Sequence, residues 1–335
     1  MWARTIGFRI LIPAGLILAG LSGCDKSPSK PAEPATPVTV AFTGQPQSAL
    51  VHVALAKGFF AEEGLDFHPK RFTYGKAALQ ALLDGQSEIA TAAETPIMFS
   101  ILKGEKILVA ANIVESNSNN GVVARTDAGI TRLSDLRGKR VGFTSGTTSD
   151  FFLASLLNGQ GMSRKDIREV PLKPEEMKDA ILSNEVDAVS TWNYTLSEIK
   201  AALGPQGVLF LDREIYTETY NIVVTEAFAK AHPEVVEKFL RALILAEEFC
   251  RTHPDEAQGI MAAATNTDRN LVRDVWSNFQ FHVGLDEITL ITLEDETRWA
   301  IANKLTGSTG MPDYLSHMYF DGLKAVRPNS VRIGR

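Results

Sequence analysis

The sequence lacks an excess of basic residues. Its 335 residues include 34 Lys and Arg against 40 Asp and Glu, which gives a net charge of −6 at pH 7. No run of basic residues with aromatic residues between them occurs along the chain. Since nucleic acids are bound through clustered positive charge, this composition argues against a nucleic-acid-binding protein.

Catalytic and metal-binding motifs are also missing from the sequence. The segment 142–146 is not a G-x-S-x-G nucleophile pattern, because Thr144 occupies the position of the serine. The histidines are scattered and match no metal-ligand spacing; they are His52, His68, His232, His253, His282 and His317. We therefore predict a protein that is not an enzyme and holds no cofactor or metal ion.

The N-terminal apolar run is too short to span a membrane. Residues 10–21 are apolar and follow Arg4 and Arg9, whereas a membrane helix needs about 20 apolar residues. This pattern is typical of an export signal. Residues 21–24, Leu-Ser-Gly-Cys, resemble the lipobox of bacterial lipoproteins, which implies cleavage before Cys24 and acylation of that cysteine. An uncleaved anchor or a chance cysteine is the alternative.

The residues after Cys24 predict where and how the protein is held. Asp25 resembles the signal that keeps such lipoproteins at the inner membrane of Gram-negative cells. Prolines recur among Ser, Lys, Ala and Thr, which favours a stiff tether over a folded segment; they are Pro28, Pro31, Pro34 and Pro37. We predict a signal peptide at 1–23, a tether at 24–37 and a globular body beyond it. Loss of the two signal-peptide arginines changes the net charge from −6 to −8.

Cysteine is scarce, with only Cys24 and Cys250 in the chain. Because the lipobox resemblance assigns Cys24 to a lipid, no intrachain disulfide is expected. Cys250 ends the strongly apolar helical segment 239–250. This setting favours a buried structural thiol over a nucleophile.

Strand and helix patterns alternate along the body, which predicts an α/β fold with two lobes. Two strand–helix series are followed by a mostly helical segment up to about residue 320, and the last fifteen residues are expected to be irregular. The predicted boundaries are 38–121 and 220–335 for lobe I and 122–219 for lobe II, with crossings near 115–125 and 212–221. A cleft between hinged lobes is a natural site for a small ligand.

Residues 141–157 form the most informative stretch of the sequence. A short strand, 141–143, is followed by the small residues 144–149, which carry five hydroxyls, and then by an apolar helix. A helix start offers unpaired N–H groups and partial positive charge, so this turn can bind an anion. The alternative is a capping box, with Thr147 as the N-cap and Asp150 three residues later.

Three segments resemble one family of transport proteins. Residues 54–65, Ala-Leu-Ala-Lys-Gly-Phe-Phe-Ala-Glu-Glu-Gly-Leu, resemble the start of periplasmic substrate-binding proteins of ABC importers. Residues 133–142 are similar to the entry into the second lobe of that family, and Val186-Asp187-Ala188 with Trp192 is similar to a later strand. The nearest branch binds nitrate, taurine and alkanesulfonates, and includes proteins related to thiamine-pyrimidine precursors. The resemblance implies two α/β lobes closing on a ligand, with a membrane permease and its ATPase as partners.

The resemblance implies that loops at strand ends line the ligand cleft, as in open α/β sheets generally. The matching positions are Gln45, Ser48, Tyr74, Glu94, Thr95, Ser145, Gly146, Thr147, Thr148, Ser149, Trp192, Asn193 and Tyr220. Each has a structural alternative: Gln45 and Ser48 as helix caps, Tyr74 as a surface aromatic, Trp192 as core and Glu94 as a helix-dipole charge.

The ligand class stays open between two possibilities. Only Lys76 among these loops is basic, so an anion would depend on N–H groups and hydroxyls. Glu94 and Asp150 would repel a bare anion if both face the cleft, so they suit a zwitterion such as an aminosulfonate. The predicted solute is small and anionic or zwitterionic, of the sulfonate, taurine and nitrate class. The aromatic residues alternatively suit an aminopyrimidine. We predict a monomeric importer subunit; a periplasmic sensory module of the same fold is the other possible role.

Overall fold

The computed structural model describes residues 1–2, 7 and 34–334. Most of the predicted signal peptide, Cys24 and most of the predicted tether therefore lie outside the described residues. The chain divides into two units, Met1–Pro34 and Ala35–Arg335, and the second unit is the globular body. Within the described residues, no helix combines the length and the apolar character needed to cross a membrane.

Two mixed sheets form the body. The first has the strand order β11-β4-β10-β3-β1-β2, and the second has the order β7-β6-β8-β5-β9. The strands of the first sheet are β1 (Thr36–Thr43), β2 (Leu65–Phe72), β3 (Ile89–Ala93), β4 (Ile107–Ser116), β10 (Glu218–Thr225) and β11 (Gln280–Gly284). Those of the second are β5 (Asn120–Arg125), β6 (Arg140–Phe143), β7 (Arg168–Pro171), β8 (Ala188–Trp192) and β9 (Gly207–Phe210). These sheets confirm the predicted α/β class.

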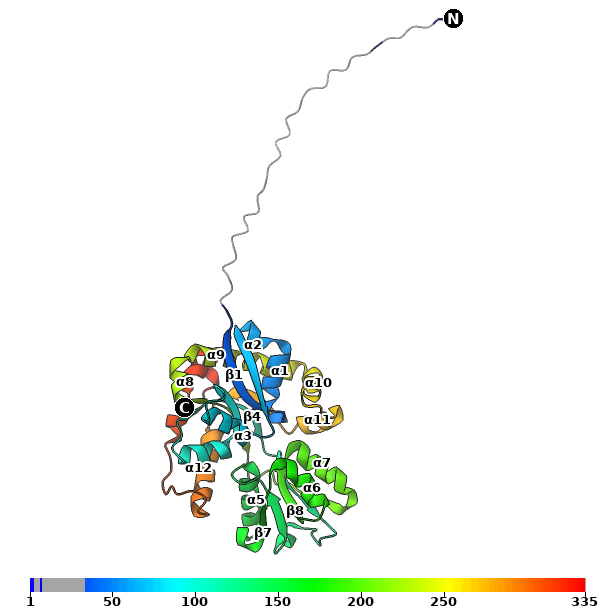
Figure 1. Cartoon of the computed structure of the whole chain (residues 1–335), viewed down its shortest axis with the longest axis vertical. Coiled ribbons are helices and arrows are strands. Elements are labelled where there is room, and N and C mark those ends of the chain that lie inside the picture. Colours follow the sequence, from blue (N-terminus) through cyan, green and yellow to red (C-terminus); the bar gives the residue numbers. More distant parts are fainter. Residues whose placement is uncertain (3–6, 8–33, 335) are drawn as a thin grey trace. The chain divides into compact units, whose positions relative to one another are not determined.

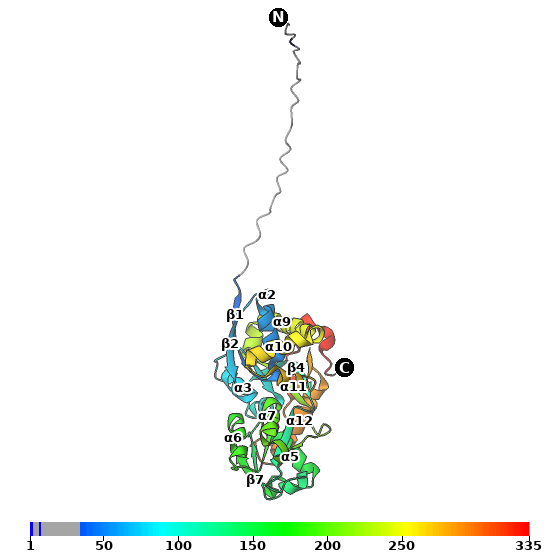
Figure 2. The same ribbon diagram turned by 90° about the vertical axis from the view of Figure 1, so that its right-hand side faces the viewer.

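Helices cover both sheets. They are α1 (Ala49–Lys57), α2 (Phe59–Glu62), α3 (Gly75–Leu83), α4 (Glu94–Leu102), α5 (Thr148–Gly159), α6 (Met177–Leu182), α7 (Asn193–Leu203), α8 (Glu226–Ala231), α9 (Pro233–Thr252), α10 (Pro254–Thr265), α11 (Arg269–Trp276), α12 (Glu287–Ala302) and α13 (Phe320–Val326). Short 3-10 turns add Pro46–Ser48, Leu133–Leu136, Arg164–Asp166, Pro174–Glu176, Gly204–Gln206, Tyr314–His317 and Pro328–Ser330. In Figures 1 and 2, α5, α6, α7 and the second sheet gather at one end of the body, away from β1 and α2.

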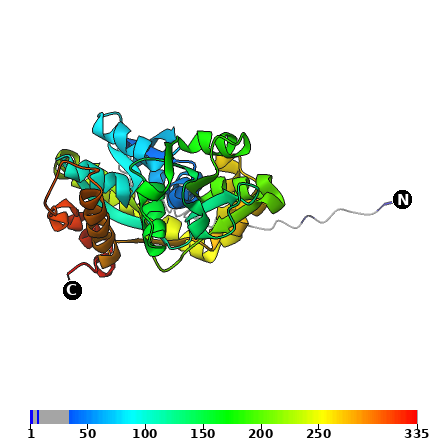
Figure 3. The same ribbon diagram turned by 90° about the horizontal axis from the view of Figure 1, so that it is seen from below.

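The chain passes from the first sheet to the second between β4 and β5, and it returns between β9 and β10. Both passages are short, spanning residues 117–119 and 211–217. Figure 3 shows the elements of the second sheet in green in front of the blue and cyan elements of the first. Such paired crossings are where a hinge would lie, and the lobe boundaries given above stay a prediction.

Alternating burial explains how the second sheet holds its helices. Val122 and Ala124 of β5 belong to one apolar cluster with Phe152 of α5, whereas Val123 belongs to another with Ile199 of α7. Successive side chains of a strand point to opposite faces. The sheet therefore lies between α5 on one face and α6 and α7 on the other.

Several local predictions agree with the structure, and others need correction. Gly58 ends α1 in the left-handed region, at φ 79°, as a C-terminal cap requires, and Cys250 is buried and free. Burial raises the pKa of its thiol to about 12. The last two residues of the predicted tether belong to β1, a strand (β11) interrupts the predicted helical segment, and α13 occupies the tail expected to be irregular.

Candidate functional site

A narrow cavity lies where strand ends of both sheets meet helix starts. Its volume is about 20 Å³, which is room for about one or two water molecules. A small organic solute needs more space than this, so entry requires movement of the side chains or of the two sheets. The lining residues are Gln45, Gln47, Tyr74, Gly75, Lys76, Ala93, Pro96, Thr147, Thr148, Trp192, Glu218 and Tyr220.

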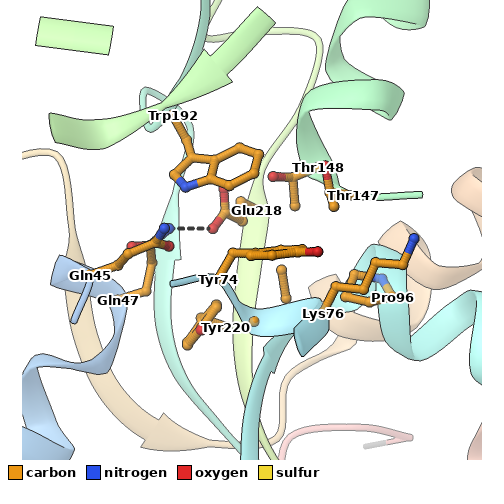
Figure 4. Close-up of a pocket in the computed structure, with 12 residues that line it drawn as sticks. Gln45, Gln47, Tyr74, Lys76, Pro96, Thr147, Thr148, Trp192, Glu218 and Tyr220 are labelled. Carbon is orange, nitrogen blue, oxygen red and sulfur yellow. Dashed lines mark hydrogen bonds between the residues drawn. The ribbon is translucent and has the colours of Figure 1, made fainter. Parts of the chain in front are cut away.

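Three aromatic side chains shape this cavity. Trp192 is the last residue of β8, and Tyr74 directly precedes α3. Figure 4 shows these two residues on opposite sides of the space, with Thr147 and Thr148 beside them. Gly75 allows the start of α3 to come close, because a Cβ there would lie 2.9 Å from the hydroxyl oxygen of Tyr220. The aromatic faces provide surfaces against which a flat or apolar group can pack.

A buried carboxylate forms one wall of the cavity. Glu218 is 1% exposed and accepts hydrogen bonds from the side-chain amides of Gln47 (3.1 Å), Asn119 (2.7 Å) and Asn120 (2.6 Å). Figure 4 marks the bond from Gln47. Burial raises the pKa of Glu218, and the three amide donors oppose that rise. Glu218 is not among the residues predicted from the sequence; the amide-rich pair at 119–120, at the opposite crossing, is the only sequence signal for it.

Hydroxyl groups support the floor beneath Tyr220. The Tyr220 hydroxyl lies 3.2 Å from the hydroxyl of Thr43, which in turn lies 3.0 Å from that of Ser48. Ser48 is fully buried and does not line the cavity. Gln45, which does, donates to the backbone oxygen of Thr73 at 2.9 Å. Ser48 therefore holds the floor in place, whereas Gln45 and Tyr220 face the space.

The hydroxyl turn, residues 144–149, divides between two hollows. Thr147 and Thr148 line the cavity, whereas Ser145 and Gly146 line a neighbouring hollow that shares Lys76 with it. Since α5 begins at Thr148, its N-terminus offers partial positive charge beside the cavity. The N–H groups of Asp150 and Phe151 donate to the backbone oxygen of Thr147, so the N–H groups of Thr148 and Ser149 are the ones left for a ligand in this first turn.

The capping-box alternative for this turn is wrong. The Thr147 side chain makes no cap hydrogen bond, and its hydroxyl donates to the backbone oxygen of Thr144 at 2.7 Å. Asp150 accepts from the N–H of Gly146 at 2.8 Å and pairs with Arg164. Its charge is thus balanced away from the cavity. Ser149 also turns inward, accepting from the N–H of Thr144 at 3.1 Å.

Lys76 connects the two sides of the site. Its ammonium donates to the backbone oxygen of Ser145 at 2.8 Å, joining α3 to the hydroxyl turn. Burial and the nearby Lys103 lower the pKa of Lys76, while Asp150 opposes this. A second hydrogen bond also joins the two sides of the site: the side-chain amide of Asn193, whose φ is 38°, donates to Gln47 at 3.2 Å.

Glu94 and Thr95 lie outside the cavity lining. The Glu94 carboxylate accepts from the Tyr216 hydroxyl and, at 2.8 Å, from the N–H of Thr219. Thr95 donates to Glu296 of α12. Burial and the neighbouring Glu296 raise the pKa of Glu94 well above its ordinary value. Both side chains are engaged in these hydrogen bonds within the protein. Their contact with a ligand stays a prediction.

The architecture is that of a periplasmic binding protein. An alkanesulfonate-binding protein of Xanthomonas axonopodis pv. citri, solved with bound MOPS, superposes with a TM-score of 0.74 at 16% identity, covering 86% of this chain and 99% of its own. A desulfurization enzyme matches with a TM-score of 0.66 at 15% identity, covering 88% and 99%. The fold therefore hosts both binding proteins and an enzyme.

The chain belongs to the NMT1/THI5-like family, whose model matches residues 45–257. The taurine-binding periplasmic protein of Escherichia coli is 26% identical over 224 residues, which is 65% of this chain and 68% of that protein. A Bacillus subtilis protein assigned to the binding of aliphatic sulfonates is 24% identical over 231 residues, 68% of this chain and 69% of that protein. The family resemblance found in the sequence is thus confirmed.

Proposed function

We propose that this protein is the extracytoplasmic solute-binding component of an ABC importer, and that its solute carries an amino group. The observation that carries the proposal is Glu218, a carboxylate held in the cavity wall by three amide donors. Those amides favour its charged form. A solute ammonium can then pair with that charge inside the cavity.

The hydroxyls of the cavity lining support a zwitterion. Thr147 and Thr148 bring hydroxyls and the start of α5 to the space, and such groups can hold a sulfonate without a basic side chain. A bare anion such as nitrate would be repelled by the Glu218 charge, and the Lys76 ammonium in the cavity lining would offset that repulsion in part. The taurine- and sulfonate-binding relatives support an aminosulfonate as the solute class.

An aminopyrimidine is the second candidate solute. Tyr74 and Trp192 lie on opposite sides of the space (Figure 4), an arrangement that suits stacking against a flat ring. Glu218 would then accept from the ring amine. A relative from Haemophilus influenzae assigned to thiamine biosynthesis, 24% identical over 215 residues, supports this alternative.

A binding role is favoured over catalysis. Among the described residues, those that line the cavity include neither Cys nor His, the side chains most used for nucleophilic and acid–base catalysis. The proposal extends to export, acylation of Cys24 and retention at the inner membrane as a monomer. The body would then deliver solute to a permease and its ATPase.

A thermal-shift panel tests the proposal on residues 35–335, which form a compact unit. The panel contains taurine, ethanesulfonate, nitrate, an aminopyrimidine and several amino acids. A ligand that binds only the folded state raises Tm. We expect the largest rise with taurine, whereas a rise with the aminopyrimidine alone would select the second candidate. A rise with nitrate or ethanesulfonate and none with either amine would contradict the proposed role of Glu218.

A further inference from the structure

A second cluster of chemically active side chains lies outside the ligand cavity. Glu115 of β4, His282 of β11 and Asp286, the residue before α12, bring one ligand atom each to within 4.8 Å of one another. Within residues 1–2, 7 and 34–334, this is the one group of three or more His, Cys, Asp and Glu side chains with that geometry. No metal site was predicted from the sequence, because the histidines are scattered and Glu115 lies far along the chain from His282 and Asp286.

The distances from the His282 nitrogen to the two carboxylates are close to those within a metal shell. The Nε2 atom of His282 lies 3.1 Å from Oδ2 of Asp286 and 3.5 Å from Oε1 of Glu115. Metal–ligand bonds of about 2.1 Å place neighbouring ligand atoms about 3.0–3.4 Å apart in octahedral or tetrahedral geometry. The two distances from His282 therefore already fit one shared ion, and the Glu115 and Asp286 oxygens lie within 4.8 Å of each other.

The backbone holds these side chains together. The register of β11 against β4 shifts between Phe281 and Gly284, so an irregularity surrounds His282. Gly284 gives the space, because a Cβ there would lie 3.2 Å from the His282 ring and 3.2 Å from the backbone oxygen of Ser330. Irregular pairing of this kind re-aims side chains at functional positions.

Burial and surrounding groups also fit a cation. The side chains of His282, Glu115 and Asp286 are 26%, 21% and 17% exposed, so they are largely desolvated and still reachable. Arg332 contacts the other oxygen of Asp286, Oδ1, at 3.5 Å, as an outer partner orients a metal-ligating carboxylate. Glu115 also lines a polar hollow of about 380 Å³, which contains Arg213 as well, and through which an ion can enter.

We propose that Glu115, His282 and Asp286 form a binding site for a divalent transition metal ion of the zinc class. Two carboxylates and one imidazole suit Zn²⁺ or Mn²⁺, and solvent would complete the shell. Ca²⁺ prefers six to eight oxygen ligands, so three side chains including a nitrogen ligand are a poor match. The bound ion joins β11 and the start of α12 to β4, just before the chain passes to the second sheet.

Calorimetric titration of residues 35–335 with ZnCl₂ tests this site. We expect one Zn²⁺ per chain, at least tenfold weaker binding in His282→Gln, and no detectable binding of Ca²⁺. His68→Gln is the matched control, because His68 pairs with Asp66 at 3.0 Å without a third ligand; its affinity should equal that of the parent. A Zn²⁺-induced rise in Tm should also disappear in His282→Gln.

Glu115→Gln provides a second variant in which the shape of the side chain is retained. It should also weaken Zn²⁺ binding at least tenfold, with the melting temperature in the absence of metal used to verify folding. Equal Zn²⁺ affinity in the parent and in a folded His282→Gln or Glu115→Gln variant would overturn the proposal, as would the absence of Zn²⁺ binding by the parent. Neither result depends on the solute bound in the cavity.

Discussion

Two buried carboxylates, Glu218 and Glu94, lie close in the structure and differ in what surrounds them. Glu218 is met by three amide donors and belongs to the cavity wall. Glu94 is met by Tyr216, Thr219 and a second buried acid, Glu296, and lies outside the wall. Donor amides stabilise a charge, whereas a neighbouring acid opposes it.

The comparison separates a binding acid from a structural one. A solute ammonium gains most from an ionised carboxylate. Burial raises the pKa of Glu218, and its three amide donors oppose that rise, whereas no amide side chain among the described residues donates to Glu94. Burial raises the pKa of both Glu94 and Glu296, which favours their protonated forms. Glu94 joins α4 to the returning crossing through Tyr216, and Glu296 joins α12 to α4 through Thr95. Both carboxylates are buried, so burial alone does not predict which of the two acids faces a ligand.

The largest expected effect is on stability. Glu218→Ala leaves the amides of Gln47, Asn119 and Asn120 without their acceptor, and each unsatisfied buried donor costs about 1–3 kcal/mol. We expect the free energy of unfolding to fall by about 3 kcal/mol or more in urea titrations. Glu94→Gln, which keeps a neutral hydrogen-bonding group, should cost less than half as much. Equal losses would remove the distinction between the two acids.

Trp192→Ala tests the aromatic wall opposite Tyr74. The indole is 4% exposed and lines the cavity, so its loss should weaken solute binding about tenfold or more. The protein should stay folded, as shown by a cooperative melting transition. Unchanged affinity for the best solute of the panel would remove Trp192 from the site.

The acid pair also predicts how stability changes with pH. The pKa of Glu94 and that of Glu296 are raised well above 4.5, chiefly by burial. Such groups stabilise the folded state below pH 4.5, and this contribution is lost as pH rises toward their folded-state pKa values. The free energy of unfolding should therefore fall with pH above 4.5, by at most about 1.4 kcal/mol per pH unit for each group.

Glu296→Gln should flatten that slope, because it removes one titrating group and the charge that opposes ionisation of Glu94. Urea titrations at several pH values between 5 and 8 measure the slope. The raised pKa of Glu218 adds a contribution of the same sign, which the variant retains. An unchanged slope would show that the pair does not titrate in this range.

The smallest expected effect concerns Lys76. Its ammonium donates to the backbone oxygen of Ser145, so it is engaged in joining the two sides of the site. Lys76→Gln should change taurine affinity by less than about fivefold, since a charge contact from a partly exposed side chain contributes about 1 kcal/mol or less. A hundredfold loss by calorimetry would instead make Lys76 the main partner of the anionic group.

Local patterns allowed much of the fold to be predicted. Gly58 ends α1 as expected, and the strand, turn and helix of residues 141–157 agree with β6 and α5. The short edge strand β11 was missed, because its residues depend on pairing with β4 more than on their own alternation. Tertiary pairing outweighs local preference in such strands.

The site was predictable only where it follows strand ends. Six of the predicted positions line the cavity: Gln45, Tyr74, Thr147, Thr148, Trp192 and Tyr220. Glu218 was missed because its hydrogen-bond donors, Gln47 and the two asparagines at the other crossing, lie far from it in the sequence. Only folding brings these side chains together. Glu94 was chosen for its place after β3, but its side chain meets Tyr216 and Thr219 instead.

The most direct test of the central claim compares taurine with ethanesulfonate, which lacks the ammonium group, by calorimetry on the parent and on Glu218→Gln. The amide in the variant keeps the shape and an acceptor oxygen, and it removes the charge. We expect the parent to bind taurine at least tenfold more tightly than ethanesulfonate, and the variant to lose that preference. An equal preference for taurine in both proteins would contradict the assignment of Glu218 as the partner of the solute's amino group.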